Sequence, residues 1–287
     1  DQPYSRDFAV EAINRGVAYS NLKKHEEAIT EYTDAIAIKT NYALAYCNRG
    51  ASYNKLKKYE EALADYSKAI EIDPKDAGAY LNRGLAYDNL KKYEEALKDY
   101  TKAIELHPKD ANAYNNRGVT YYNLKKHEEA LVDYTKAIEI DPKYAFAYAN
   151  RGIAYNNLKK YEKAIADYTK AIEINPKYVL AYTNRGIAYD NLKKYEEALK
   201  DYTKAIELDP KYVFAYTNRG ATYENLKKYE EALKDYTKAI ELDPKDADAY
   251  TNRGGVYRDL EKYEEAITEY TKAIELDPNN VAVYKSQ

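Results

Sequence analysis

The stretch Ala77–Asp110 reads AGAYLNRGLAYDNLKKYEEALKDYTKAIELHPKD. Apolar and small residues recur at spacings of three and four from Tyr80 to Leu90, and again from Tyr93 to Leu106, which is the period of an amphipathic helix. A short polar connection separates the two runs, and Pro108 ends the second because proline cannot continue a helix. The stretch therefore predicts a helical hairpin.

The same pattern recurs along nearly the whole chain. It occurs eight times with a period of 34 residues, in units that begin at Ala9, Ala43, Ala77, Ala111, Ala145, Val179, Val213 and Ala247. One hairpin cannot bury its apolar stripe alone, but stacked copies can, so each unit should touch only its neighbours. The sequence predicts an all-α solenoid of helix-turn-helix repeats over residues 9–280, a leader over residues 1–8, and the start of a truncated ninth helix over residues 281–287.

The composition limits the classes of function. The chain has 45 basic and 48 acidic residues and a net charge of -3, which argues against nucleic-acid binding because that affinity depends on concentrated Lys and Arg. The sequence shows neither an apolar run long enough to span a membrane nor a recognisable signal peptide. We therefore expect no membrane partner and a cytoplasmic location. The single cysteine, Cys47, precludes an intrachain disulfide.

Positions are counted from the first residue of each unit, so that Ala77 is position 1 of the third. The triplet Asn-Arg-Gly stands at positions 6 to 8 of every unit. Glycine inside a helix costs about 1 kcal/mol relative to alanine, so its recurrence predicts a close approach of two helices, with a tyrosine of the partner helix above it. The arginines form either a ladder of phosphate sites or a set of ion pairs. An acid at position 23 of every unit favours ion pairs. We expect Arg83 to pair with Asp99, and the other arginines to pair likewise, within a unit or with the adjacent one.

These residues resemble the tetratricopeptide repeat, a helical hairpin of 34 residues. The third unit carries the family's pattern at Tyr80, Gly84, Tyr87, Ala96, Tyr100 and Pro108. It departs from that pattern where Arg83 replaces a leucine, and where tyrosine replaces the family's Trp and Phe. The resemblance implies a right-handed superhelix whose first helices line a concave groove that binds other polypeptides. It also implies that the protein is not a catalyst.

An asparagine precedes each arginine and lies about 100° from it around the helix. If the arginines point to the partner helix, the asparagines point to the groove and form a ladder of Asn14, Asn48, Asn82, Asn116, Asn150, Asn184, Asn218 and Asn252. A carboxamide both donates and accepts hydrogen bonds, so such a ladder can hold an extended peptide backbone, as the resemblance to peptide-binding members of the family also implies. Position 13 adds a second row of Asn21, Asn89, Asn123, Asn157, Asn191 and Asn225, interrupted by Lys55 and Asp259. Solvation, or bonds between units, is the alternative for every asparagine.

The variable positions of the first helix bear on the ligand. Chaperone-binding members of the family hold a C-terminal carboxylate with basic residues at positions 2, 5 and 6, but none of these positions is basic here. Position 12 carries Asp88, Asp190 and Glu224, which predicts a mildly acidic groove and a neutral or weakly basic ligand. Phe146 and Phe214 at position 2 are either anchors for an apolar ligand side chain or buried between units, and we expect burial.

The sequence shows no arrangement typical of a catalytic or metal site. His25, His107 and His127 lie far apart in the array, and Cys47 has no histidine at a fixed offset. We therefore expect no enzyme activity, no metal site and no cofactor. The leading hypothesis is a protein-interaction scaffold that binds an extended peptide. The alternatives are a structural or self-assembling spacer that stacks end to end, and the substrate-recruiting domain of a larger enzyme.

Overall fold

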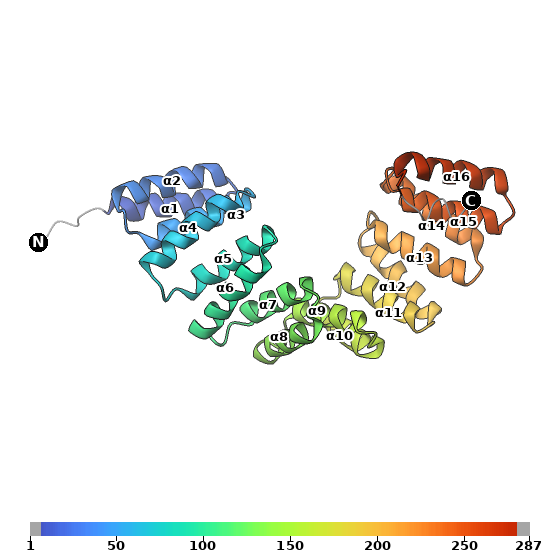
Figure 1. Cartoon of the computed structure of the whole chain (residues 1–287), viewed down its shortest axis with the longest axis horizontal. Helices are drawn as coiled ribbons and strands as arrows, with labels where there is room; N and C mark the ends of the chain where they lie inside the picture. Colours follow the sequence, from blue (N-terminus) through green and yellow to red (C-terminus); the bar gives the residue numbers. More distant parts are fainter. Residues whose placement is uncertain (1–6, 280–287) are drawn as a thin grey trace, which may run out of the picture. The chain divides into compact units, whose positions relative to one another are not determined.

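The described part of the protein, residues 7–279 of a computed structural model, consists of helices and short connections (Figure 1). Over these residues the helices are Phe8–Asn21 (α1), His25–Ile38 (α2), Ala43–Lys55 (α3), Tyr59–Ile72 (α4), Ala77–Asn89 (α5), Tyr93–Leu106 (α6), Ala111–Asn123 (α7), His127–Ile140 (α8), Ala145–Asn157 (α9), Tyr161–Ile174 (α10), Val179–Asn191 (α11), Tyr195–Leu208 (α12), Val213–Asn225 (α13), Tyr229–Leu242 (α14), Ala247–Asp259 (α15) and Tyr263–Leu276 (α16). The expected ninth helix and most of the expected leader lie outside the described residues.

Among the described residues, the helices form two compact units, the first with α1 to α8 and the second with α9 to α16. The 34-residue units of the sequence are called repeats from here on. Inside each unit, the first helix of a repeat packs against its own second helix, and that second helix packs against the first helix of the next repeat. First helices of neighbouring repeats also touch, as α9 touches α11 and α11 touches α13. This nearest-neighbour packing confirms the predicted solenoid of helix-turn-helix repeats.

The connection inside each hairpin is a left-handed turn at a lysine, or at Glu261 in the last repeat. After α5, Lys91 has a φ of 59°. The N–H of Lys91 donates to the Asp88 carbonyl at 2.9 Å, and the N–H of Lys92 donates to the Tyr87 carbonyl at 2.9 Å. These two bonds cap the helix C-terminus in the Schellman pattern, so the Lys-Lys pair sets the turn that folds the second helix back on the first.

Each repeat is held together by a tyrosine packed against a glycine. A methyl group added to Gly186 on α11 would lie 2.6 Å from Cε1 of Tyr202 on α12, and Tyr202 is fully buried. The same contact recurs in the other repeats, with distances between 2.4 and 2.9 Å. The predicted reason for the glycine is confirmed: the partner tyrosine ring occupies the place of a Cβ.

Candidate functional site

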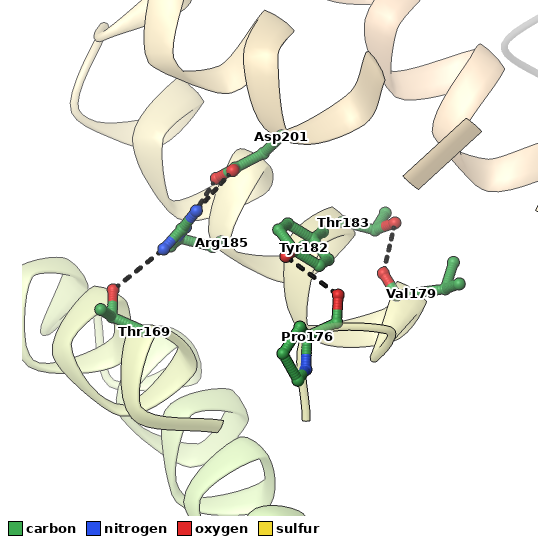
Figure 2. Close-up of polar contacts among 7 residues, drawn as sticks. All are labelled: Thr169, Pro176, Val179, Tyr182, Thr183, Arg185 and Asp201. Atoms are coloured by element: carbon green, nitrogen blue, oxygen red, sulfur yellow. Dashed lines mark hydrogen bonds and ion pairs between the residues drawn. The ribbon is translucent and has the colours of Figure 1, made fainter. Parts of the chain in front are cut away.

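The arginine of each triplet forms the predicted ion pair within its own repeat. Arg185 donates from Nε to Oδ2 of Asp201 at 2.8 Å and from Nη2 to Oδ1 at 2.7 Å, and Nη1 donates to Oγ1 of Thr169 in the preceding repeat at 3.2 Å (Figure 2). The equivalent pairs are Arg15–Glu31, Arg49–Asp65, Arg83–Asp99, Arg117–Asp133, Arg151–Asp167, Arg219–Asp235 and Arg253–Glu269. The fork of donors that would bind a phosphate is therefore already occupied by a carboxylate.

Aromatic rings complete the surroundings of this pair. The guanidinium carbon of Arg185 lies 5.8 Å from the ring centre of Tyr182 and 6.0 Å from that of Tyr189, within reach of a cation–π interaction. The hydrogen bond with Asp201 raises the pKa of Arg185 above its ordinary value. Tyr182 in turn donates its hydroxyl to the Pro176 carbonyl at 3.1 Å, which ties the repeat to the loop before it (Figure 2). Two of the three triplet residues thus serve the fold.

The asparagines of the triplets lie at the surface of the first helices. Asn14 is exposed, and the others are half-buried: Asn48, Asn82, Asn116, Asn150, Asn184, Asn218 and Asn252. Asn218 donates from Nδ2 to the Phe214 carbonyl one turn earlier at 2.8 Å. The second row is exposed throughout, at Asn21, Asn89, Asn123, Asn157, Asn191 and Asn225. Within each unit the asparagines therefore recur at one position of successive first helices, with part of each side chain open to a ligand.

Comparison with known protein families gives matches that recur with the same 34-residue period. A family model described as tetratricopeptide repeat matches residues 43–76, 77–110, 111–144, 145–178, 179–212, 213–246 and 247–280, and a second model described as TPR repeat matches residues 16–57. The chain belongs to the tetratricopeptide-repeat family. A comparison with curated proteins gives no match.

Solved tetratricopeptide-repeat structures share this fold. A chain of the APC/C hetero-tetramer Cut9–Hcn1 matches with a TM-score of 0.68 and 18% identity over 91% of this chain, which spans 52% of that chain. A tetratricopeptide repeat protein from Parabacteroides merdae matches with a TM-score of 0.67 and 24% identity over 85% of this chain and 96% of its own. YrrB, described as a TPR protein with an unusual peptide-binding site, has a TM-score of 0.54 and 29% identity over 65% of this chain and 96% of its own.

The acids at position 12 of the tetratricopeptide repeats do not form an open acidic surface, which corrects our expectation of a mildly acidic groove. Asp190 accepts hydrogen bonds from the hydroxyl of Tyr202 and from Oγ1 of Thr222 in the next repeat, the latter at 2.8 and 2.9 Å. Asp88 is bound in the same way by Tyr100 and Thr120. Burial raises the pKa of Asp190 above that of an exposed aspartate. These two carboxylates link successive repeats.

Sequence reasoning missed this link, although its signal is present. Threonine occurs at position 10 only in the fourth and seventh repeats, as Thr120 and Thr222, and each follows a repeat with aspartate at position 12. The second and fifth repeats carry Asn54 and Asn156 there, and the repeats after them carry alanine. The Oδ1 atoms of both asparagines are buried without a hydrogen-bond partner among residues 7–279. The aspartate at position 12 and the threonine at position 10 of the next repeat therefore occur together.

Transferring this link to the junction of the fifth and sixth repeats should stabilise the protein. The double variant Asn156→Asp/Ala188→Thr places an acid and a hydroxyl at the positions that Asp190 and Thr222 hold one repeat later. It also gives a hydrogen-bond donor to the buried side-chain oxygen of residue 156, which now has none among the described residues. We expect a gain of about 1 kcal/mol, the usual worth of one buried hydrogen bond, measured by urea unfolding. Ala188→Thr alone should give no gain, and a double variant no more stable than the wild type would contradict the assignment.

The phenylalanines at position 2 are exposed, which corrects the expected burial between repeats. Phe146 is 59% exposed and Phe214 is 65% exposed. The helix packing buries positions 3, 8 and 10 of α9 and α13 and turns position 2 toward solvent, so Ala147 and Ala215 occupy the core instead. The apolar side chains of position 2 are thus available to a partner.

Two features that catalytic sites often use are a metal-binding cluster and a reactive thiol. Over residues 7–279, no group of three or more His, Cys, Asp or Glu side chains is placed to hold a metal ion. Burial, together with the nearby Asp76 carboxylate, raises the pKa of the Cys47 thiol to about 12, which disfavours the thiolate needed for nucleophilic attack. None of the described helices has the length and apolar character needed to cross a membrane.

Proposed function

We propose that this tetratricopeptide-repeat protein is an interaction scaffold that holds an extended polypeptide along its first helices, with the asparagine ladder bonded to the peptide backbone. Its single strongest support is that the three residues of the triplet have different roles. Arginine and glycine are both used by the fold, as Arg185 and Gly186 show, whereas the asparagine before them keeps part of its surface open in every repeat. The peptide-binding site attributed to YrrB supports the same conclusion.

The chemistry of the carboxamide fits this role. Each asparagine offers an acceptor and two donor hydrogens, which match the C=O and N–H of a peptide unit in an extended chain. Because those groups are the same for every residue type, the ladder binds with little regard to side chains. Asn82, Asn116 and Asn184 make no side-chain hydrogen bond with another residue of the described part, so at these three positions no internal bond must break before a ligand binds. Asn218 must first release the Phe214 carbonyl.

The test compares the wild type with Asn184→Ala/Asn218→Ala/Asn252→Ala on an array of random nine-residue peptides. Three lost hydrogen bonds, at about 0.5–1.5 kcal/mol each, predict at least a tenfold loss of affinity across peptides of unrelated sequence. The matched control changes exposed residues of the second helices, Lys200→Ala/Lys234→Ala/Thr268→Ala, since alanine already stands at this position as Ala64 and Ala166. Equal binding by wild type and ladder variant would reject the proposal.

A further inference from the structure

Three consecutive first helices of the second unit carry exposed apolar residues at position 2. These are Phe146 on α9, Leu180 on α11 and Phe214 on α13, of which 59%, 38% and 65% are exposed. A tyrosine lies against each phenylalanine: the ring centre of Tyr178 lies 5.5 Å from that of Phe146, and the ring centre of Tyr212 lies 5.7 Å from that of Phe214, both edge to face. We call these five residues the apolar strip.

The three helices that carry the apolar strip lack a side-chain cap at their N-termini. α9, α11 and α13 are preceded by tyrosines that make no side-chain cap hydrogen bond, namely Tyr144, Tyr178 and Tyr212. By contrast, α15 is capped by Asp246, whose side chain accepts from the N–H of Asp248, and Asp248 is itself the residue at position 2. A helix without a side-chain cap has a less stable N-terminus. The apolar residue at position 2 does not make up this lost stability, because it is exposed and buries little surface.

The same association holds in three repeats of the first unit, where the pairs are Asp76 with Gly78, Asp110 with Asn112, and Tyr42 with Leu44. The first repeat departs from it, because Asp7 caps α1 while the apolar Val10 stands at position 2. In the other repeats, both residues of the pair thus change together. Since exposed apolar patches on soluble domains mark interaction sites, folding alone does not account for the strip.

We propose that the strip binds the side chains of an acidic peptide segment that has an apolar residue at every third position. This inference rests on the proposed function and names the ligand class for the second unit. Packed helices lie about 8–10 Å apart, and α9, α11 and α13 touch in sequence. A polyproline II chain has three residues per turn and advances about 3.1 Å per residue, so every third side chain returns to the same side after about 9 Å. A β-strand repeats its side after about 6.6 Å, which does not match.

The ladder and the strip lie close enough to share one ligand. Positions 2 and 6 are one helical turn apart, and Asn218 donates directly to the carbonyl of Phe214 at 2.8 Å. A peptide that crosses α9, α11 and α13 can therefore place its backbone against Asn184 and Asn218 while its apolar side chains contact the strip. The absence of internal backbone hydrogen bonds in polyproline II leaves the N–H and C=O groups free for the ladder.

The charge beside the strip favours acidic residues between the apolar ones. Lys177 is exposed and directly precedes Tyr178, and the positive end of the α11 dipole lies at the same place. The connection before α11 contains no carboxylate, since Asn175 stands where Asp209 stands one repeat later. In the connection before α13, Asp209 offsets the charge of Lys211. The charge of Lys177 has no such neighbour, so the unbalanced positive charge lies next to Leu180. Asp248 ends the strip, because it would repel an acidic segment on α15.

The experiment uses three labelled nine-residue probes and fluorescence anisotropy on the whole chain. The first is Leu-Pro-Glu repeated three times, the second has the same composition with its leucines adjacent, and the third is Leu-Pro-Gln repeated three times. We expect the first to bind at least tenfold more tightly than the second, and more tightly than the third by a margin that shrinks in salt. Phe146→Ser/Phe214→Ser should lose at least tenfold for the first probe. Val132→Ser, at a residue 68% exposed on α8, should lose nothing.

The outcomes separate this inference from the proposed function. Equal affinity for the first two probes, no binding of the first probe, or full affinity in the phenylalanine variant would overturn the strip, even if the ladder variant still loses its array peptides. Equal affinity for the first and third probes would overturn the acidic ligand. Because Phe146 and Phe214 are exposed, the variant should melt at the wild-type temperature, and Leu180→Ser provides an independent readout if it does not.

Discussion

Replacing Asp201 with alanine should lower the free energy of unfolding by about 3–5 kcal/mol, the usual loss when one partner of a buried ion pair is removed. Asp201 is 4% exposed and accepts two hydrogen bonds from Arg185 at 2.7 and 2.8 Å. The variant leaves the guanidinium near the rings of Tyr182 and Tyr189, with a hydrogen bond to Thr169 but no carboxylate partner. Urea unfolding of variant and wild type, followed by circular dichroism, measures the difference.

Two further variants separate the ion pair from other effects. Arg185→Leu/Asp201→Ala removes both charges and restores the leucine typical of the family, so it should regain most of the lost stability, because an apolar replacement can match a buried pair. Lys200→Ala, at the exposed neighbour of Asp201, should change stability by less than about 0.5 kcal/mol. If Asp201→Ala stays within about 1 kcal/mol of the wild type, the pair is not structural and the arginines again become candidates for anion binding.

The sequence was sufficient for the features that recur in every repeat. The 34-residue period predicts the helical hairpins, and an acid that accompanies each arginine predicts the ion pairs, because an interaction essential to one repeat must be present in all. The glycine also recurs in every repeat, and its recurrence predicts the close tyrosine contact seen at Gly186 and its equivalents.

Features that vary between repeats were harder to predict. The bond between Asp190 and Thr222 joins two repeats, so its signal appears only when one repeat is compared with the next. The exposure of Phe146 was missed because hydrophobicity predicts burial, and the position lies at the first turn, where a small rotation of the helix decides between core and solvent. The role of the asparagines remains a prediction, since it depends on a ligand.

Replacing Gly186 with valine should be about as damaging to the protein as the loss of a large core side chain. Its Cβ would lie 2.6 Å from Cε1, 2.9 Å from Cδ1 and 3.0 Å from Cζ of Tyr202, and two further methyl groups would enter the same space. Tyr202 is fully buried and donates its hydroxyl to Asp190, so its ring cannot move aside without breaking that hydrogen bond. Overpacking of this kind costs about 1–3 kcal/mol and occasionally more, and we expect the upper end.

Gly78→Val is the matched control, because it makes the same change in a first helix at an exposed site. A Cβ at Gly78 meets only the side chain of Asp76 at 3.2 Å, and Leu44 and Leu180 already occupy this position in other repeats. Valine has the higher helix propensity, so this variant should be neutral or slightly stabilised in urea unfolding. Since each repeat is stabilised mainly by its neighbours, the Gly186 variant should also increase amide hydrogen exchange in α9 to α14 before the chain unfolds as a whole. Equal stability of the two variants would show that the tyrosine contact is not what retains glycine in the triplet.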